Sequence, residues 1–231
     1  DVYKRQAYDA GVTIGTYLKQ LGFNVDYAPV ADVLTNPGNT AIGTRSFGSD
    51  ASMVADMVIK ELEGLSSQGV FGAVKHFPGQ GGVSGDSHDG AVTLDKSLEE
   101  LMQTELVPFQ KALENGVSFV MVGHISVPQV VGDNTPASLS QMMVSNVLRE
   151  QLGYQGIVIT DAMNMGAVTG NYTADQAAVM AVNAGVDMIL MPQDYETAYN
   201  GLLQAVQDGT ISEERIDESV ERIVKVKLQM Q

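Results

Sequence analysis

Five short apolar runs alternate with segments of helical periodicity along almost the whole chain. The runs centre near residues 25, 72, 120, 158 and 188, so they lie roughly 30 to 48 residues apart. None of them alternates apolar with polar residues, which is typical of parallel strands that are buried on both faces. The order is a helix, then five strand–helix units, then an extra helix. It predicts an α/β fold that is built on a parallel sheet.

Either a doubly wound sheet or a (β/α)8 TIM-type barrel accommodates this order. The barrel is favoured because polar residues follow the carboxyl ends of several different strands, which is where barrel active sites lie. A doubly wound sheet would gather them at one crevice. Five strands do not close an eight-stranded barrel, and the chain opens with Asp1 rather than Met. We therefore expect one incomplete barrel domain over residues 1–231, with roughly the first three βα units and any export signal upstream.

The helical pattern is strongest in six segments. The predicted helices cover residues 7–21, 50–68, 97–115, 140–152, 174–183 and a tail from about 195 to 231 that is broken at 208–209. The helix at 97–115 has the clearest start, because Ser97 and Glu100 form a capping box.

Composition excludes several classes of function. A formal net charge of −15 argues against a nucleic-acid partner and against an anionic membrane surface, and it suits a neutral or cationic small ligand. The chain has no cysteine, so disulfides, thiolate catalysis and cysteine zinc sites are excluded. No apolar run approaches the roughly 18 residues that a membrane span needs. Neither the GxGxxG nor the GxxxxGK[ST] fingerprint is present, and we expect no cofactor.

The segment 75–88 combines ionisable side chains with four glycines, directly after an apolar run. This pattern predicts a buried strand that continues into a flexible loop able to fold over a ligand. Lys75 and His76, at the strand end, can bind hydroxyls or an anion. Further along, Asp86 can hydrogen-bond the imidazole of His88, fix its tautomer and raise its basicity. An ordinary polar loop is the alternative.

Polar residues at other strand ends extend this group of candidates. Asp161, held by a buried strand, can act as a nucleophile in glycoside or acyl chemistry, or it can merely cap the following turn. His124 follows another apolar strand and is either a ligand contact or a satisfied rim histidine. Arg45 is either a substrate clamp or a loop staple. A metal site among the histidines and Asp86 is disfavoured, since no HExxH-type spacing is present.

Taken together and in order, these motifs resemble glycoside hydrolase family 3, in its β-N-acetylhexosaminidase branch. The resemblance covers nearly all of the chain from about residue 7, and each motif is weak singly whereas the ordered set is specific. The matching stretches are DYAPVADV at 26–33, IGTRSFG at 42–48, KHFPG at 75–79, DSH at 86–88, VGH at 122–124 and ITDAMNMGA at 159–167.

The resemblance implies a (β/α)8 barrel that hydrolyses terminal, non-reducing β-linked N-acetylglucosamine with retention of configuration. It places the nucleophile on Asp161 and the general acid/base on His88, with Asp86 as the dyad partner of this histidine. The implied sugar-binding residues are Lys75, His76 and Arg45. His124 and Asp32, which lie at the same level of the barrel, are further candidates for substrate binding.

Two departures from the family pattern leave alternatives open. The family usually has a second histidine where Gln80 stands, and its acidic, Gly-rich N-terminal substrate motif has no match here. A β-glucosidase of the same family is one alternative, although such enzymes lack the triplet 86–88. A phosphorylase with the same dyad and a non-catalytic or inactive sugar-binding barrel are the others. We expect a small N-acetylglucosamine-containing oligosaccharide as the partner, with no nucleic acid and no membrane span.

Overall fold

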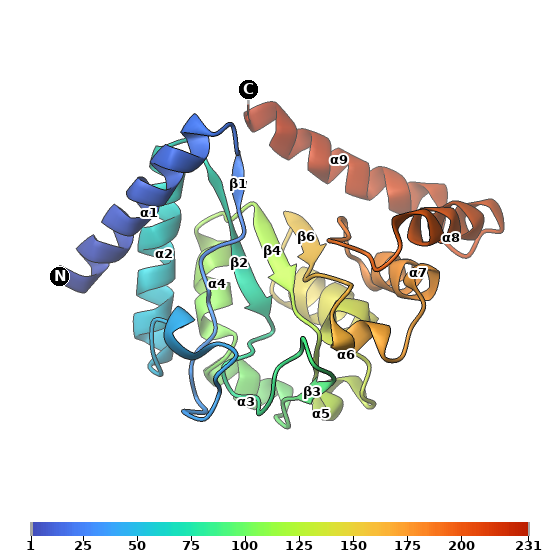
Figure 1. The fold of residues 1–231 in the computed structure, drawn as a ribbon, viewed down its shortest axis with the longest axis horizontal. Helices are drawn as coiled ribbons and strands as arrows, with labels where there is room; N and C mark the ends of the chain where they lie inside the picture. The colour runs from blue at the N-terminus through green and yellow to red at the C-terminus, as the bar shows by residue number, and fades with distance from the viewer. Residues whose placement is uncertain (1, 231) are drawn as a thin grey trace.

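The computed structural model describes residues 2–230 and contains a four-stranded parallel sheet (Figure 1). The strands, in their order across the sheet, are β1 (Val25–Asp26), β2 (Phe71–Phe77), β4 (Phe119–Val122) and β6 (Ile157–Thr160). A parallel bridge between Ile159 and Met188 adds a fifth segment beside β6. The prediction of five consecutive parallel strands is confirmed, although the last one is reduced to a single bridge.

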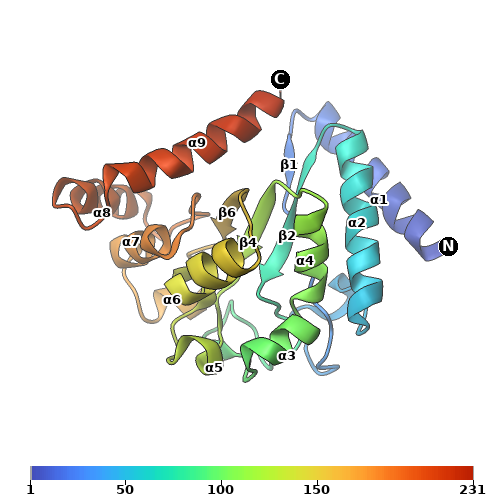
Figure 2. The same ribbon diagram turned by 180° about the vertical axis from the view of Figure 1, so that it is seen from behind.

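At least one helix lies between each pair of successive strands of this sheet along the chain, and further helices precede the first strand and follow the last. The α4 helix lies behind β2 in Figure 1 and in front of it in Figure 2, which is drawn from the opposite side. None of the helices formed by residues 2–230 has the length and apolar composition needed to cross a bilayer. The helical segments are α1 (Val2–Gln20), α2 (Ala51–Ser67), α3 (Leu98–Gln103), α4 (Val107–Glu114), the π-helical η3 (Met142–Gln151), α6 (Gly166–Thr169), α7 (Ala174–Ala184), α8 (Tyr195–Gln207) and α9 (Glu213–Gln229).

Strand order and helix placement together decide between the two architectures considered from the sequence. The order across the sheet follows the order along the chain and never reverses, so the sheet formed by residues 2–230 has no topological switch point. Parallel strands in chain order that are joined by helices are the arrangement of a barrel wall, and α4 lies on one face of β2 as a wall helix does. The fold is therefore a TIM-barrel-like α/β fold, present as an incomplete barrel.

Three local predictions needed correction. The helix expected over 97–115 is split into α3 and α4, because Pro108 in the first turn of α4 has no N–H to continue the preceding helix. The helix expected over 140–152 is π-helical. Segments expected to be loops contain β3 (Val92–Thr93) and β5 (Ile125–Ser126), which pair in parallel because Val92 and Ile125 are both buried, and the short α5 (Pro128–Val131).

The core fixes the sheet against its helices. Every residue of β4 and β6 is buried. Phe77 at the end of β2 packs edge to face against Phe109 of α4, with ring centroids 5.5 Å apart. Each fully buried large apolar side chain stabilises the fold by about 1.5–3 kcal/mol. The carboxyl ends of the strands therefore form a rigid edge for the residues that follow them.

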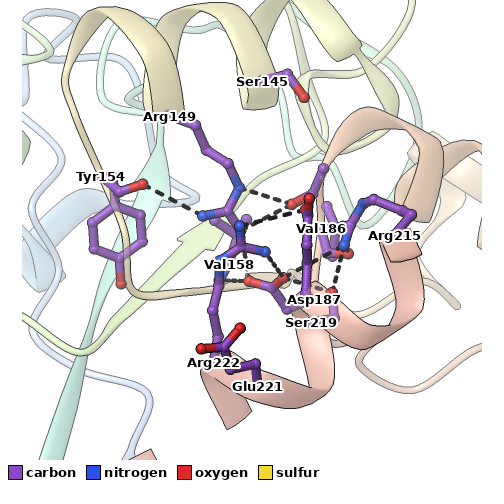
Figure 3. A network of polar contacts seen from close by, with 12 residues as sticks. Ser145, Arg149, Tyr154, Val158, Val186, Asp187, Arg215, Ser219, Glu221 and Arg222 are labelled. Carbon is purple, nitrogen blue, oxygen red and sulfur yellow. Dashed lines mark hydrogen bonds and ion pairs between the residues drawn. The ribbon is translucent and has the colours of Figure 1, made fainter. Parts of the chain in front are cut away.

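The amino end of the sheet is held by an ionic network around Asp187, whose side chain has no exposed surface (Figure 3). One carboxylate oxygen accepts hydrogen bonds from Arg149 Nη2 at 2.6 Å and from the backbone N–H of Val158 at 2.9 Å. The other accepts from Ser219 Oγ at 2.6 Å and from Arg222 Nη1 at 3.0 Å. The network ties η3, β6 and α9 together through a single side chain.

Candidate active site

Asp161 directly follows β6, at the carboxyl end of the sheet. Its N–H donates to Val122 O on the neighbouring strand at 2.8 Å, which fixes the backbone. One carboxylate oxygen, Oδ1, accepts from the N–H of Ala162 at 2.8 Å. The other, Oδ2, lies 4.0 Å from His76 Nε2, and the side chain is 16% exposed. Asp161 thus combines a fixed orientation with one oxygen that a ligand can approach.

His76, near the end of β2, is oriented by Asp32. Its Nδ1 donates to Asp32 Oδ2 at 2.7 Å, and its backbone N–H donates to Asp32 Oδ1 at 3.2 Å. Because a carboxylate only accepts, Nδ1 carries the proton and Nε2 points at Asp161. Asp32 has no exposed surface, so it lies beneath the site rather than on its open surface.

Lys75 and Arg45 supply positive charge near these carboxylates. Burial lowers the pKa of Lys75, the negative charge of Asp161 opposes this, and the charge of Arg45 adds to the lowering. Arg45 is exposed and donates through Nη2 to Ala41 O at 2.5 Å, in the 3-10 segment η1 (Gly43–Arg45) and the turn before it. Both cations therefore act electrostatically at the end of the sheet that carries Asp161.

The predicted pairing of Asp86 with His88 is present in the loop after β2. Asp86 Oδ1 accepts from His88 Nδ1 at 2.7 Å and from the backbone N–H of His88 at 3.0 Å. The backbone and side-chain hydrogen bonds from His88 lower the pKa of Asp86, burial opposes them, and the charge of Arg45 adds slightly to the lowering. Since Nδ1 must be the donor to the carboxylate, Nε2 is the ring nitrogen of His88 that can exchange a proton. The His88 side chain is 66% exposed, so Nε2 is accessible.

His124, unlike His88, is fully engaged inside the protein. Its Nε2 donates to Ala162 O at 3.0 Å, so its Nδ1 accepts from Ser138 Oγ at 2.7 Å. Burial lowers the pKa of His124, and the hydrogen bond to Ala162 and the charge of Asp161 oppose this. His124 is therefore placed to hold the residue that follows Asp161.

The structure brings the predicted residues into two pairs at one end of the sheet. His76 and Asp161 form one pair, and Asp86 and His88 form the other. Sequence reasoning missed the buried partner Ser138, because nothing in its local pattern marks a hydroxyl that will face a histidine 14 residues earlier. Within residues 2–230, no three His, Asp or Glu side chains lie close enough together to hold a metal ion.

Two large cavities lie at the other end of the sheet. They have volumes of about 840 and 870 Å³ and share the residues before β4, Gly116, Val117 and Ser118. Neither is lined by Asp161, His76 or the loop that carries His88. Size alone does not identify a catalytic site, which requires a nucleophile and a base in suitable geometry.

Comparison with known proteins agrees with the chemistry of the strand ends. Residues 2–226 match the family model described as glycosyl hydrolase family 3 N terminal domain. The chain is 31% identical over 252 residues to beta-hexosaminidase A of Pseudoalteromonas piscicida. This match covers 100% of the chain and 41% of the relative. The chain is also 36% identical over 231 residues to beta-hexosaminidase LpqI of Mycobacterium tuberculosis. That match covers 96% of the chain and 59% of the relative.

A solved structure gives the same result. A glycoside hydrolase family 3 beta-N-acetylglucosaminidase from Paenibacillus sp. superposes with a TM-score of 0.96 at 41% identity. The superposition covers 98% of this chain and 44% of that one. The chain thus spans about half the length of the curated relatives it matches.

Proposed function

Because the chain belongs to glycosyl hydrolase family 3, we propose that it forms the catalytic barrel of a retaining glycosidase that removes terminal β-linked N-acetylglucosamine. The observation that carries the proposal is the contrast between two acidic groups at the same end of the sheet. Asp161 Oδ1 is held only by a backbone N–H and Oδ2 is open to a ligand, whereas Asp86 Oδ1 accepts both the ring N–H and the backbone N–H of His88. The first arrangement suits a nucleophile, and the second suits the partner of a proton-transfer group.

In the first step, Asp161 Oδ2 attacks the anomeric carbon of the sugar. The bond from this carbon to the leaving oxygen breaks, and that oxygen takes a proton from Nε2 of the His88 imidazolium. A glycosyl ester of Asp161 and a neutral His88 result. The carboxylate of Asp86 stabilises the imidazolium before transfer and keeps the ring oriented afterwards.

In the second step, Nε2 of neutral His88 takes a proton from water as the water oxygen attacks the anomeric carbon. The ester bond breaks, Asp161 regains its carboxylate and His88 regains its proton. Two displacements at one carbon retain its configuration. A histidine in place of the second carboxylate of most retaining enzymes also avoids a second negative charge beside Asp161.

The remaining candidate residues divide into those that contact the sugar and those that position others. Lys75, His76 and Arg45 are suited to bind sugar hydroxyls, because Lys75 and Arg45 carry N–H donors and His76 directs Nε2 toward Asp161, with its Nδ1 proton held by Asp32. Asp32 and His124 are suited to positioning, because their polar atoms are occupied by His76 and by the backbone after Asp161. The beta-hexosaminidase and beta-N-acetylglucosaminidase relatives support a carbohydrate substrate.

The proposal is tested by hydrolysis of an aryl N-acetylglucosaminide with the full polypeptide. Asp161→Ala should lower kcat/KM by about 1,000-fold or more. His88→Ala should lower it by about 100- to 10,000-fold. Asp217→Ala, a change at an exposed position of α9, is the matched control and should leave the rate unchanged. An unchanged rate in either site variant contradicts the assignment.

Three further measurements distinguish the proposed activity from its alternatives. Faster turnover of an aryl glucoside than of the N-acetylglucosaminide indicates a β-glucosidase. A sugar phosphate that forms only when inorganic phosphate is present indicates a phosphorylase. Binding of N-acetylglucosamine without any turnover indicates a non-catalytic barrel.

A further inference from the structure

In the triplet 86–88, two exposed side chains flank a buried one, and the proposed proton transfer does not explain why the middle residue is buried. The side chains of Asp86 and His88 are 39% and 66% exposed, whereas Ser87 between them has no exposed surface. The Ser87 hydroxyl accepts a hydrogen bond from Gln80 Nε2 at 3.1 Å. Ser87 therefore anchors the triplet from within the protein.

Gln80 is itself fixed on both sides of its backbone. Its N–H donates to Asp32 Oδ1 at 2.6 Å, and its carbonyl accepts from Asn39 Nδ2 at 2.6 Å. The same Asp32 carboxylate receives the ring of His76. A continuous series of hydrogen bonds thus runs from Ser87 through Gln80 and Asp32 to His76, which faces Asp161.

A second attachment joins the triplet to the segment after Asp161. The N–H of Gly166 donates to His88 O at 3.0 Å, and the N–H of Ala167 donates to Ser87 O at 3.1 Å. The approach is close, since a Cβ at Gly166 would lie 2.7 Å from His88 O. The triplet is therefore held by two backbone hydrogen bonds on one side and by one side-chain amide on the other.

From these contacts we infer that Gln80 is a positioning residue, whose amide latches Ser87 and thereby holds His88 where it can protonate a leaving group. This role rests on the proposed function. Gly81 and Val83 are buried and Asn36 binds both of their carbonyls, whereas Ser84 and Gly85, directly before the triplet, are exposed, so the chain restrains the triplet weakly at this point. Loss of the amide leaves only the two backbone hydrogen bonds to Gly166 and Ala167. Because each hydrogen bond contributes about 1 kcal/mol, removing one should increase local opening several-fold.

Amide hydrogen exchange on the full polypeptide tests the latch without reference to activity. Gln80→Ala should accelerate exchange at Gly166 and Ala167 by about 5- to 10-fold, the effect of one hydrogen bond. Ser87→Ala removes the same bond from the other partner and should give a similar acceleration. The double variant should exchange no faster than either single variant. Gln155→Ala, at an exposed glutamine, is the matched control.

Unchanged exchange in both single variants, or additive acceleration in the double variant, overturns the latch. If Gln80→Ala fails to fold, Ser87→Ala still tests the latch, because it removes the same hydrogen bond and leaves the Gln80 side chain in place.

The dependence on the leaving group tests the positioning role. Substrates with a sugar or alkyl leaving group need the proton of His88, whereas a dinitrophenyl leaving group does not. Gln80→Ala should lower kcat/KM about 10-fold for substrates with a sugar or alkyl leaving group and little for the dinitrophenyl substrate. Gln80→His, whose ring N–H can also reach a hydroxyl, should restore part of the rate. Equal losses for all leaving groups overturn the role. If the unmodified chain hydrolyses none of them, the proposed function fails, and the exchange comparison still decides on the latch.

Discussion

The two ends of the sheet each carry a buried or half-buried aspartate, and the two carboxylates differ in how many hydrogen bonds they accept. At the amino end, Asp187 accepts hydrogen bonds from two arginines, a serine and a backbone N–H, so both of its oxygens are fully used. At the carboxyl end, Asp161 accepts one backbone hydrogen bond at Oδ1, and its Oδ2 only approaches His76. A carboxylate with every lone pair engaged holds structure together. One with an accessible oxygen can react.

The same contrast separates the histidines. Both ring nitrogens of His124 are occupied inside the protein, and burial keeps its pKa low. In His88, one nitrogen is oriented by Asp86 and the other faces solvent. The two groups to which we assign chemistry, Asp161 and His88, thus each keep one polar atom accessible, whereas Asp187 and His124 keep none.

The largest expected effect on stability tests the amino end. Asp187→Ala should lower the free energy of unfolding by about 3–5 kcal/mol, because it leaves buried guanidinium groups without their shared anion. Chemical denaturation measures this loss. Asp217→Ala on the same helix as Arg222 is the control and should stay within about 0.5 kcal/mol. A similar loss in both variants, or none in Asp187→Ala, breaks the proposed difference between the ends.

A second variant sharpens the comparison within the carboxyl end. Asp32→Asn keeps the size of the side chain but removes a carboxylate that orients His76. We expect kcat/KM for an aryl N-acetylglucosaminide to fall about 10- to 100-fold, the range usual for residues that orient a contacting side chain. The split between kcat and KM shows whether binding or chemistry suffers. Full activity in a folded Asp32→Asn variant contradicts the positioning role.

The smallest effect concerns Glu61 of α2, a carboxylate that is neither one of the candidate site residues nor part of the Asp187 network. Burial, with repulsion from Asp26 added and attraction to Lys75 opposing it, raises the pKa of Glu61 from 4.5 to about 7. The folded chain thus binds this proton more tightly than the unfolded chain. The resulting contribution to stability is fully present below about pH 4.5 and is lost as the pH rises through about 7.

Glu61→Gln should therefore stabilise the protein relative to the parent at pH 8, by on the order of 1–2 kcal/mol after allowance for solvent screening. The difference should vanish near pH 4.5. Glu63→Gln, at an exposed neighbour of α2, serves as the control. Denaturation curves at the two pH values measure the effect, and a stabilisation that does not change with pH rules out this origin.

The features that the sequence predicted are those set by local pattern. The alternation of strands and helices, the placement of Asp161 at a strand end and the pairing of Asp86 with His88 all depend on residues close together in the chain. The network at Asp187 was not predicted, because its arginines come from η3 and α9 and meet only after the chain folds back over the amino end of the sheet. The engagement of His124 likewise depends on distant partners, Ser138 and Ala162.

The claim that Asp161 is the reactive carboxylate is tested most directly by trapping the sugar on it. A fluorinated N-acetylglucosaminide with an activated leaving group should slow the second step and let the covalent intermediate accumulate. Mass spectrometry of the digested protein should then find one sugar on the peptide that contains Asp161, and none in Asp161→Ala. A sugar attached to another residue, or product of inverted configuration with no adduct, would contradict the account.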